Sequence, residues 1–221
     1  MSATPQGEQV IVTGASPHLV TTPTCPAAVR EAYHTLFTNV EVALGPGVRR
    51  FIAVAALDDT AHAAPVAANL ALLAAESGER TVLVDADVRT PTLHDLFGVA
   101  ATPGLAQYFT GRHDDLDALV QPTPAPRLGV ITAGVGPARF DRLDRLGDVP
   151  AVLRDLAHVA DRVIVVVAPV LTGTSALLVG AHVDGVVVVA TRGQSRRREA
   201  ARVGALLDRM RIPMLGVVLA A

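Results

Sequence analysis

The sequence predicts an α/β protein built on a mostly parallel sheet of about six or seven strands, with helices on both faces. The first observation behind this is a series of short runs rich in Val, Ile, Leu and Ala, each bounded by turn residues. The second is that helical patterns alternate with these runs, which is the order expected of successive βαβ units. Because the runs are apolar on both faces, the sheet must be covered on both sides.

The elements follow in order along the chain. Residues 1–26 carry four prolines and many Thr and Ser, so we expect a flexible Pro/Thr-rich N-terminal arm with a short extended piece at 10–13. Residues 27–221 are expected to form a single α/β domain. A helix is expected from Val29, where apolar residues recur on one helix face, to the stop at Gly45-Pro46-Gly47. Strands are then expected at 51–56, 81–86, 128–132, 163–167, 185–190 and 214–219, and helices near 65–77, 92–97, 104–120, 141–158, 174–181 and 195–210.

Composition excludes several classes of function. All 19 basic residues are arginine, so no lysine can form a Schiff base or reach a phosphate. A net charge of −2 gives no reason to expect nucleic-acid binding. Cys25 is the single cysteine, which excludes an internal disulfide and a thiolate metal cage. With no signal-peptide pattern at the start and no apolar run of spanning length, we expect a cytoplasmic protein.

Several segments, in order, carry a resemblance to a known family. The strand that ends in Asp85 and Asp87, followed by Arg89 and Pro91, is the most distinctive. Further matches are Ala67–Ala71, Leu93–Gly98, Pro103–Leu105, Ala133-Gly134, Ala168–Leu171, Val183–Val186 and Leu215–Leu219. Together these resemble the bacterial tyrosine kinases of the capsule and exopolysaccharide type, relatives of the deviant Walker A ATPases that position chromosomes and septa. The resemblance implies a P-loop NTPase-like three-layer sandwich that binds ATP and Mg²⁺.

The phosphate-binding loop of that family departs from its pattern here. The family reads glycine, any residue, glycine, lysine, Ser or Thr, then Thr, because amides, an ammonium and a hydroxyl must meet the phosphates and Mg²⁺. The corresponding residues are Thr60, Ala61, His62, Ala63, Ala64 and Pro65. Asp58 and Asp59 precede them, and each would repel a phosphate roughly 6 Å away by about 2–3 kcal/mol. We therefore expect a degenerate loop and no cofactor.

The acidic residues of the family's site survive only in part. The resemblance places Val166 where the second Mg²⁺ carboxylate belongs, at the Walker B position. Asp85 and Asp87 remain and could form the acidic side of a metal site, but we interpret them as remnants that cap a turn and pair with Arg89. No histidine pair has zinc spacing, so no metal site is expected.

Candidate partner-binding residues lie in two helices. Glu31, His34 and Phe37 occupy the family's Glu-x-x-Arg-x-x-Arg segment, which helps subunits associate, although both arginines are replaced. Arg196, Arg197 and Arg198 begin the last long helix and could dock an acidic partner or anionic lipid, although a solvated face explains them as well. No tyrosine follows Tyr108, whereas the family ends in a phosphorylated tyrosine cluster.

Three hypotheses for function follow. The first is a catalytically inactive pseudo-enzyme that regulates or scaffolds surface-polysaccharide synthesis or export. The resemblance implies as its partner a membrane co-polymerase or chain-length protein, or an active kinase paralogue, at the inner face of the plasma membrane, and a homo-oligomer is conceivable. The second is an ATP-dependent tyrosine autokinase or ATPase with a rearranged site and Tyr33 or Tyr108 as its target. The third is a positioning protein of the ParA/MinD type, favoured if ATP drives dimerisation.

Overall fold

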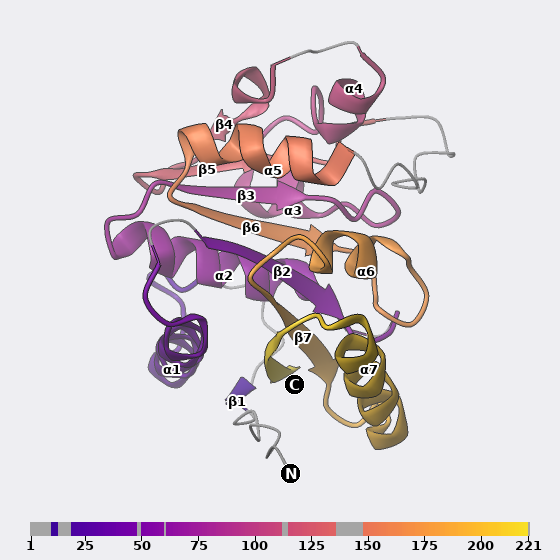
Figure 1. Cartoon of the computed structure of the whole chain (residues 1–221). Coiled ribbons are helices and arrows are strands. Elements are labelled where there is room, and N and C mark those ends of the chain that lie inside the picture. The colour runs from indigo at the N-terminus through magenta and orange to yellow at the C-terminus, as the bar shows by residue number, and fades with distance from the viewer. Residues whose placement is uncertain are drawn as a thin grey trace.

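The computed structural model describes residues 10–12, 19–47, 50–59, 61–111, 115–135 and 148–220. In this part of the chain eight strands form one sheet in the order β1-β8-β7-β2-β6-β3-β5-β4 (Figure 1). The strands are β1 (Val10–Val12), β2 (Arg50–Ala56), β3 (Thr81–Asp85), β4 (Gln121–Pro122), β5 (Leu128–Ile131), β6 (Arg162–Val167), β7 (Gly185–Thr191) and β8 (Met214–Ala220). Every pairing is parallel except that of β4 with β5. The predicted mostly parallel sheet is confirmed.

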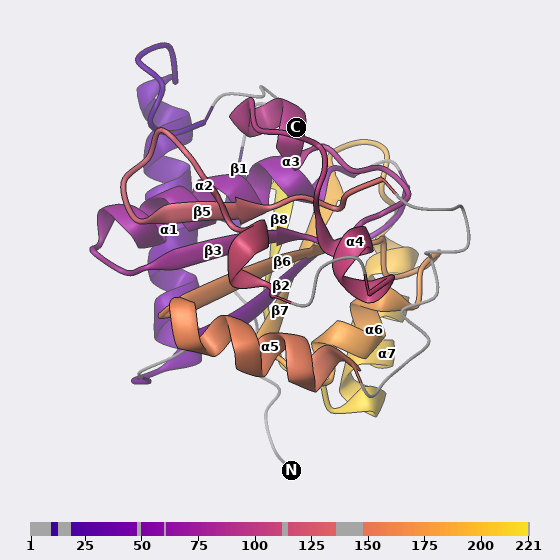
Figure 2. The same ribbon diagram turned by 90° about the horizontal axis from the view of Figure 1, so that it is seen from above.

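Helices cover both faces of the sheet, as predicted (Figure 2). They are α1 (Ala27–Leu44), α2 (Ala63–Glu76), α3 (Leu93–Phe97), α4 (Leu105–Phe109), α5 (Asp148–Val159), α6 (Ser175–Gly180) and α7 (Arg197–Met210), with a 3₁₀ turn at Asp117–Leu119. One core lies between the sheet and α1, α2 and α3, and a second lies between the sheet and α5, α6 and α7. Alternate residues of the strands point into the two cores, which is why the strands are apolar throughout.

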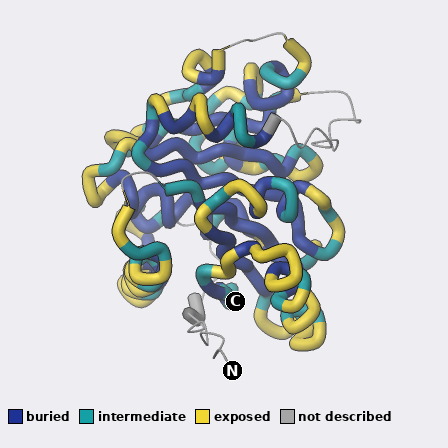
Figure 3. The backbone as a smooth tube through the Cα atoms, in the orientation of Figure 1, coloured by how far each residue is buried: buried dark blue, intermediate teal, exposed yellow. Residues whose placement is uncertain are grey.

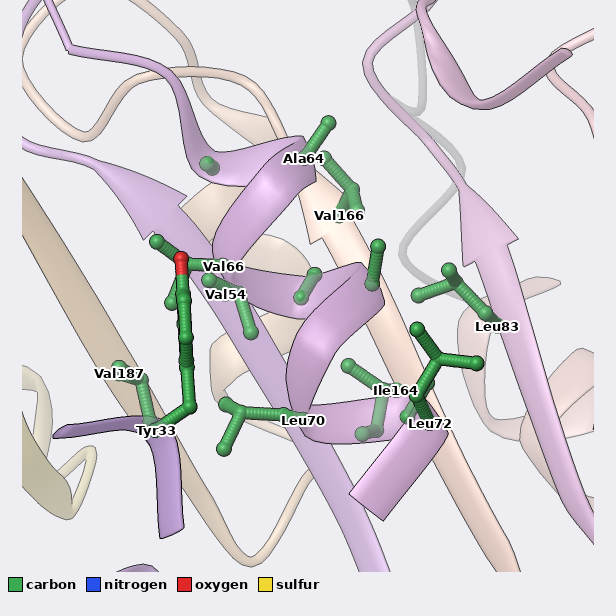
Figure 4. Packing of buried hydrophobic residues seen from close by; sticks show 14 of the residues in the cluster. Tyr33, Val54, Ala64, Val66, Leu70, Leu72, Leu83, Ile164, Val166 and Val187 are labelled. Carbon is green, nitrogen blue, oxygen red and sulfur yellow. The ribbon is translucent and has the colours of Figure 1, made fainter. Parts of the chain in front are cut away.

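The buried helix α2 organises the first core. Of its 14 residues, all but Pro65 and Glu76 are buried, so it is apolar on every side (Figure 3). Figure 4 shows Val66, Leu70 and Leu72 of this helix packed on the strands, with Tyr33 of α1 beside them. Because α2 is held on all sides, its first turn has a fixed place at the edge where β2, β3 and β6 end.

The described chain differs from the predicted elements in three places. The short extended piece at 10–12 pairs with β8, and Val20 and Cys25, within the expected arm, are buried in the first core. The two-residue strand β4 was not predicted, because two residues carry no periodicity. The boundary of the arm at residue 26 stays a prediction.

The helix expected over 104–120 is wrong. The structure has a helix of five residues, α4, which ends before Gly111, and a separate 3₁₀ turn at Asp117–Leu119. Gly111 has a φ of 67°, a left-handed conformation that stops a helix and favours glycine. Gly104 starts α4 against the end of β5, where a Cβ would lie 2.3 Å from the carbonyl oxygen of Thr132. The apolar spacing therefore arose from two short elements that pack on one core.

Candidate functional site

A hollow of about 310 Å³ lies where the carboxyl ends of β2 and β6 meet the first turn of α2 and the loop after β3. Ligands of open α/β sheets bind at this edge. The hollow brings together seven of the residues singled out from the sequence: Asp59, Ala61, His62, Ala63, Ala64, Asp87 and Val166. Thr60 lies outside the described residues, and Asp58 accepts a hydrogen bond at its carbonyl from the amide of Ala61, at 3.3 Å.

The loop before α2 enters the helix without glycine. His62 is the N-cap residue, in an extended conformation, and its side chain makes no capping hydrogen bond. Ala63 and Ala64 follow in the first turn, and their methyl groups line the hollow. Pro65 is tolerated there because amides of a first helical turn have no partner within the helix. The helix end thus offers few N–H groups and methyl groups in place of a charge or hydroxyl.

The floor of the hollow is apolar. Val166, in β6, is 3% exposed and lies in register between Val54 of β2 and Asp85 of β3. Figure 4 shows its side chain next to Ala64 at the start of α2. An isopropyl group cannot bind a cation or accept a hydrogen bond, so this position supplies only packing.

Three loops are joined across the rim of the hollow. The hydroxyl of Thr172 donates to Asp59 Oδ1 at 2.9 Å, and Arg89 Nη2 lies 3.9 Å from the same oxygen. Arg89 Nη1 also donates to the carbonyl of Thr172 at 3.5 Å. We call Asp59, Arg89 and Thr172 the rim clasp. It corrects two expectations, because the Arg89 guanidinium pairs with Asp59 rather than with Asp85 or Asp87, and the Asp59 charge is exposed and partly neutralised.

The two remnant aspartates have different surroundings. Asp87 lines the hollow, and its carboxylate accepts hydrogen bonds from the amides of Arg89 and Thr90 and from the Thr90 hydroxyl. Asp85 is 1% exposed and accepts three amides, from Asp87 at 3.2 Å, Thr92 at 3.1 Å and Leu93 at 3.2 Å. Asp85 thereby ties β3 to the start of α3, so the turn-capping interpretation is confirmed for both residues.

Burial raises the pKa of Asp85 from 3.8 to about 6, against the three amide hydrogen bonds that lower it, and the charge of Asp87 raises it further. The folded chain therefore holds a proton that the unfolded chain releases between pH about 4 and 6. Since the folded state binds more protons in this window, stability falls as the pH rises through it.

We expect the free energy of unfolding to fall by about 1–1.5 kcal/mol more in the wild-type chain than in Asp85→Asn on going from pH 5 to pH 7. Asparagine cannot ionise, which removes this contribution while retaining an oxygen for the amides of α3. Urea unfolding at both pH values measures the difference. Parallel pH dependences of the two proteins would contradict the buried, proton-holding state of Asp85.

The candidate partner residues lie away from the hollow. Glu31 and His34 are exposed on α1, and His34 borders a second hollow, of about 260 Å³, with Arg30 and Glu76. Phe37 is half-buried and packs against the first core, with its ring centroid 5.6 Å from Arg162 Cζ. Arg196, Arg197 and Arg198 are exposed where α7 begins.

Sequence reasoning missed a buried ionic network at the opposite edge of the sheet. Arg162, which opens β6, is 1% exposed. Its guanidinium donates to Glu79 at 2.5 and 3.0 Å and to Glu41 at 2.6 Å, and Arg50 also pairs with Glu41. Burial alone would lower the Arg162 pKa, but the two carboxylates outweigh it and raise the pKa. An arginine directly before an apolar run was the available signal.

The tyrosines considered as phosphorylation targets are both engaged. Tyr33 is 6% exposed and hydrogen-bonds to the side chain of Asn69, and burial raises its pKa. Tyr108 is half-buried, and its hydroxyl donates to Asp155 of α5 at 3.4 Å. A kinase could reach the Tyr33 hydroxyl only after α1 had moved away from α2.

Two further properties concern metals and membranes. In the described part of the chain, no three His, Cys, Asp or Glu side chains are placed to hold a metal ion. Across the same residues, none of the helices combines the length and the apolar character needed to cross a bilayer.

Comparison with known proteins gives consistent relatives. No family model matches the chain. It is 27% identical over 189 residues to tyrosine-protein kinase YwqD of Bacillus subtilis, covering 86% of this chain and 79% of that protein. Other curated tyrosine kinases that it matches are much longer, and it spans 23–26% of their length.

Solved structures agree. The chimerical protein CapA2B2 is 25% identical with a TM-score of 0.82, over 97% of this chain and 94% of that one. The septum site-determining protein MinD of Pyrococcus horikoshii, solved with Mg-ADP, has a TM-score of 0.62 at 20% identity, over 77% of this chain and 70% of that one. This second likeness concerns the P-loop NTPase-like fold.

Proposed function

Since this chain is a relative of the bacterial tyrosine kinases and has their fold, we propose that it is a catalytically inactive member of that family. It would act as a regulatory or scaffold module in the synthesis or export of surface polysaccharide. Its activity would lie in binding another protein, with no chemical step of its own.

The observation that carries this proposal is the chemistry of the loop before α2. A nucleoside triphosphate needs inward-turned amides, a cation near its outer phosphates and a hydroxyl for Mg²⁺. The hollow has methyl groups at Ala63 and Ala64 and a proline ring at the next position. No glycine occurs between Gly47 and Gly78, and the chain has no lysine that could replace the missing one. These residues do not fit a magnesium-bound triphosphate.

The other sides of the hollow support the same proposal. Val166 offers no ligand at the position of the second carboxylate, and Asp85 is committed to the amides of the loop before α3. Arg89 is the one cation that lines the hollow, and it belongs to the rim clasp. A rearranged catalytic site would need Arg89 to leave Asp59 and Asp85 to turn toward the hollow, and each change would break contacts present in the fold.

The proposed partner is a membrane-bound chain-length or export protein, or an active kinase paralogue. This follows from the resemblance, because a module that has lost its chemistry keeps a role through the surfaces that its relatives use. Binding through such a partner would hold the chain at the inner face of the plasma membrane.

A titration of ATP with Mg²⁺ tests the proposal. We expect isothermal titration calorimetry of the whole chain to give no binding up to about 1 mM ATP, weaker than about −4 kcal/mol. YwqD under the same conditions is the positive control. Binding in the micromolar range would overturn the proposal and favour an ATPase or autokinase, and dimerisation driven by ATP would favour a positioning protein instead.

A further inference from the structure

A groove of about 550 Å³ runs between the first turns of α7 and strand β8, away from the hollow at α2. Its floor is apolar, made by Ala190 of β7 and by Val217 and Leu219 of β8. Arg196 and Arg197 stand at its border, where α7 begins. We call this feature the arginine groove. Figure 2 shows α7 on the same face of the sheet as α5 and α6.

The floor is open because the start of α7 is too small to cover it. Val203 and Leu207, further along the helix, are buried in the second core. The preceding turn presents Ala200 and Ala201, whose methyl groups leave Val217 and Leu219 half-exposed. Side chains from another molecule could therefore bury apolar surface here without any helix moving.

The charge beside the groove is strongly positive. Five arginines (192, 196, 197, 198 and 202) lie within eleven residues that contain one acid, Glu199. Glu199 accepts a hydrogen bond from the backbone amide of Arg196, at 3.2 Å, and so caps the helix. Within the described residues, none of these five guanidinium groups forms an ion pair. Because the whole chain has a net charge of −2, this positive surface is local.

The groove is also held in shape by its backbone. The amide of Arg192 donates to the carbonyl of Ala220 at 2.7 Å, which fixes the end of β7 to the end of β8. The amide of Thr191 donates to the Ser195 hydroxyl at 3.0 Å, which fixes the turn that leads into α7. A preformed groove costs little ordering when a partner binds.

We propose that the arginine groove binds an acidic segment of a partner protein. Apolar side chains of the segment would lie on Val217 and Leu219, while its Asp or Glu carboxylates would meet Arg196 and Arg197. Charge complementarity selects the acidic partner, and bidentate arginine–carboxylate pairs would fix its position. The inference deepens the proposed function and rests on it, because it names the surface through which an inactive module would act.

A lipid surface fits these features less well. Peripheral membrane helices present protruding Trp, Phe or Leu side chains beside their cations. Here the apolar side chains lie at the base of a groove, and the exposed turn of α7 carries alanine. A concave apolar floor bordered by cations fits a polypeptide better than a bilayer.

The test is a selection of random 12-residue peptides, displayed on phage, against the whole chain. We expect enrichment of sequences that combine Asp or Glu with Leu, Ile, Val or Phe. The best peptide, labelled for fluorescence anisotropy, should bind at least about tenfold more weakly to Arg196→Ala/Arg197→Ala, which corresponds to about 1.4 kcal/mol. It should also bind at least about tenfold more weakly to Ala201→Phe, which fills the groove and keeps every charge.

Arg209→Ala/Arg211→Ala is the matched control, since it removes two exposed arginines at the other end of α7 and should leave peptide affinity unchanged. Selected peptides without acidic residues, or equal affinity for the groove variants and the wild-type chain, would overturn the proposal. So would Arg196-dependent sedimentation with phosphatidylglycerol vesicles in the absence of any acidic peptide ligand. The ATP titration is independent of these measurements, so failure of the groove and failure of the inactive-module proposal are distinguishable.

Discussion

Replacing Arg162 by alanine should lower the free energy of unfolding by about 3–5 kcal/mol. The guanidinium is 1% exposed and forms three hydrogen bonds to the carboxylates of Glu79 and Glu41. Its removal takes the cation away from both acids at once. It also removes the face on which Phe37 packs, at 5.6 Å from ring centroid to Cζ. This substitution combines a lost buried charge with a lost packing surface.

The size of the effect follows from the number of elements that meet at Arg162. Glu41 belongs to the last turn of α1, Glu79 to the connection between α2 and β3, and Arg162 itself to β6. Arg50, in register with Arg162 on β2, shares Glu41 and donates to the carbonyl of Gly45 at 2.7 Å. The network thus attaches α1 to the sheet at the edge opposite the hollow.

Urea unfolding of three variants measures this effect. Arg80→Ala is the control, because Arg80 pairs with Asp161 across an exposed surface and should give a clearly smaller loss than Arg162→Ala. Arg162→Met with Glu79→Gln should recover part of the loss, since it removes one of the two acids and restores apolar volume. Equal losses for Arg80→Ala and Arg162→Ala would mean that the buried network contributes no more than a surface ion pair.

The sheet was predictable because its strands carry an unambiguous signal. The runs that became β2, β6 and β7 are apolar on both faces, and that pattern fits a covered parallel sheet. The span 104–120 was not predictable, because its apolar residues fit a helical period although they belong to two short elements. The left-handed Gly111 between them has no signal distinct from other glycines.

The residues of the site were predictable, but their orientations were not. Motif order placed Ala63, Ala64, Asp87 and Val166 around one hollow, as found. The direction of the Asp85 side chain depends on amides of the loop before α3. The pairing of Arg89 depends on Thr172, which is far away in the sequence. Contacts of this kind come from tertiary packing, which a motif does not encode.

Rebuilding the family's loop should convert the hollow into a nucleotide site. The variant combines Thr60→Gly, His62→Gly, Ala63→Lys, Ala64→Thr and Pro65→Thr. The methyl groups of Ala63 and Ala64 line the hollow, so longer side chains at these positions would enter it rather than the packed core. The glycines free the backbone amides, and the lysine adds a cation for the phosphates at the start of α2, where the helix dipole also favours an anion.

We expect the rebuilt chain to bind ADP or ATP with a Kd below about 100 μM, where the wild-type chain shows no binding at about 1 mM. The matched control carries the same changes with Ala63 retained, and it should bind at least about tenfold more weakly because the phosphate charge lacks its cation. Adding Val166→Asp should make the affinity depend on Mg²⁺, since it supplies the oxygen ligand that the floor lacks. A rebuilt chain that melts as the wild type does but binds no nucleotide would show that the loop is not what separates this protein from its nucleotide-binding relatives, and the rim clasp of Asp59, Arg89 and Thr172 would then be the remaining obstacle.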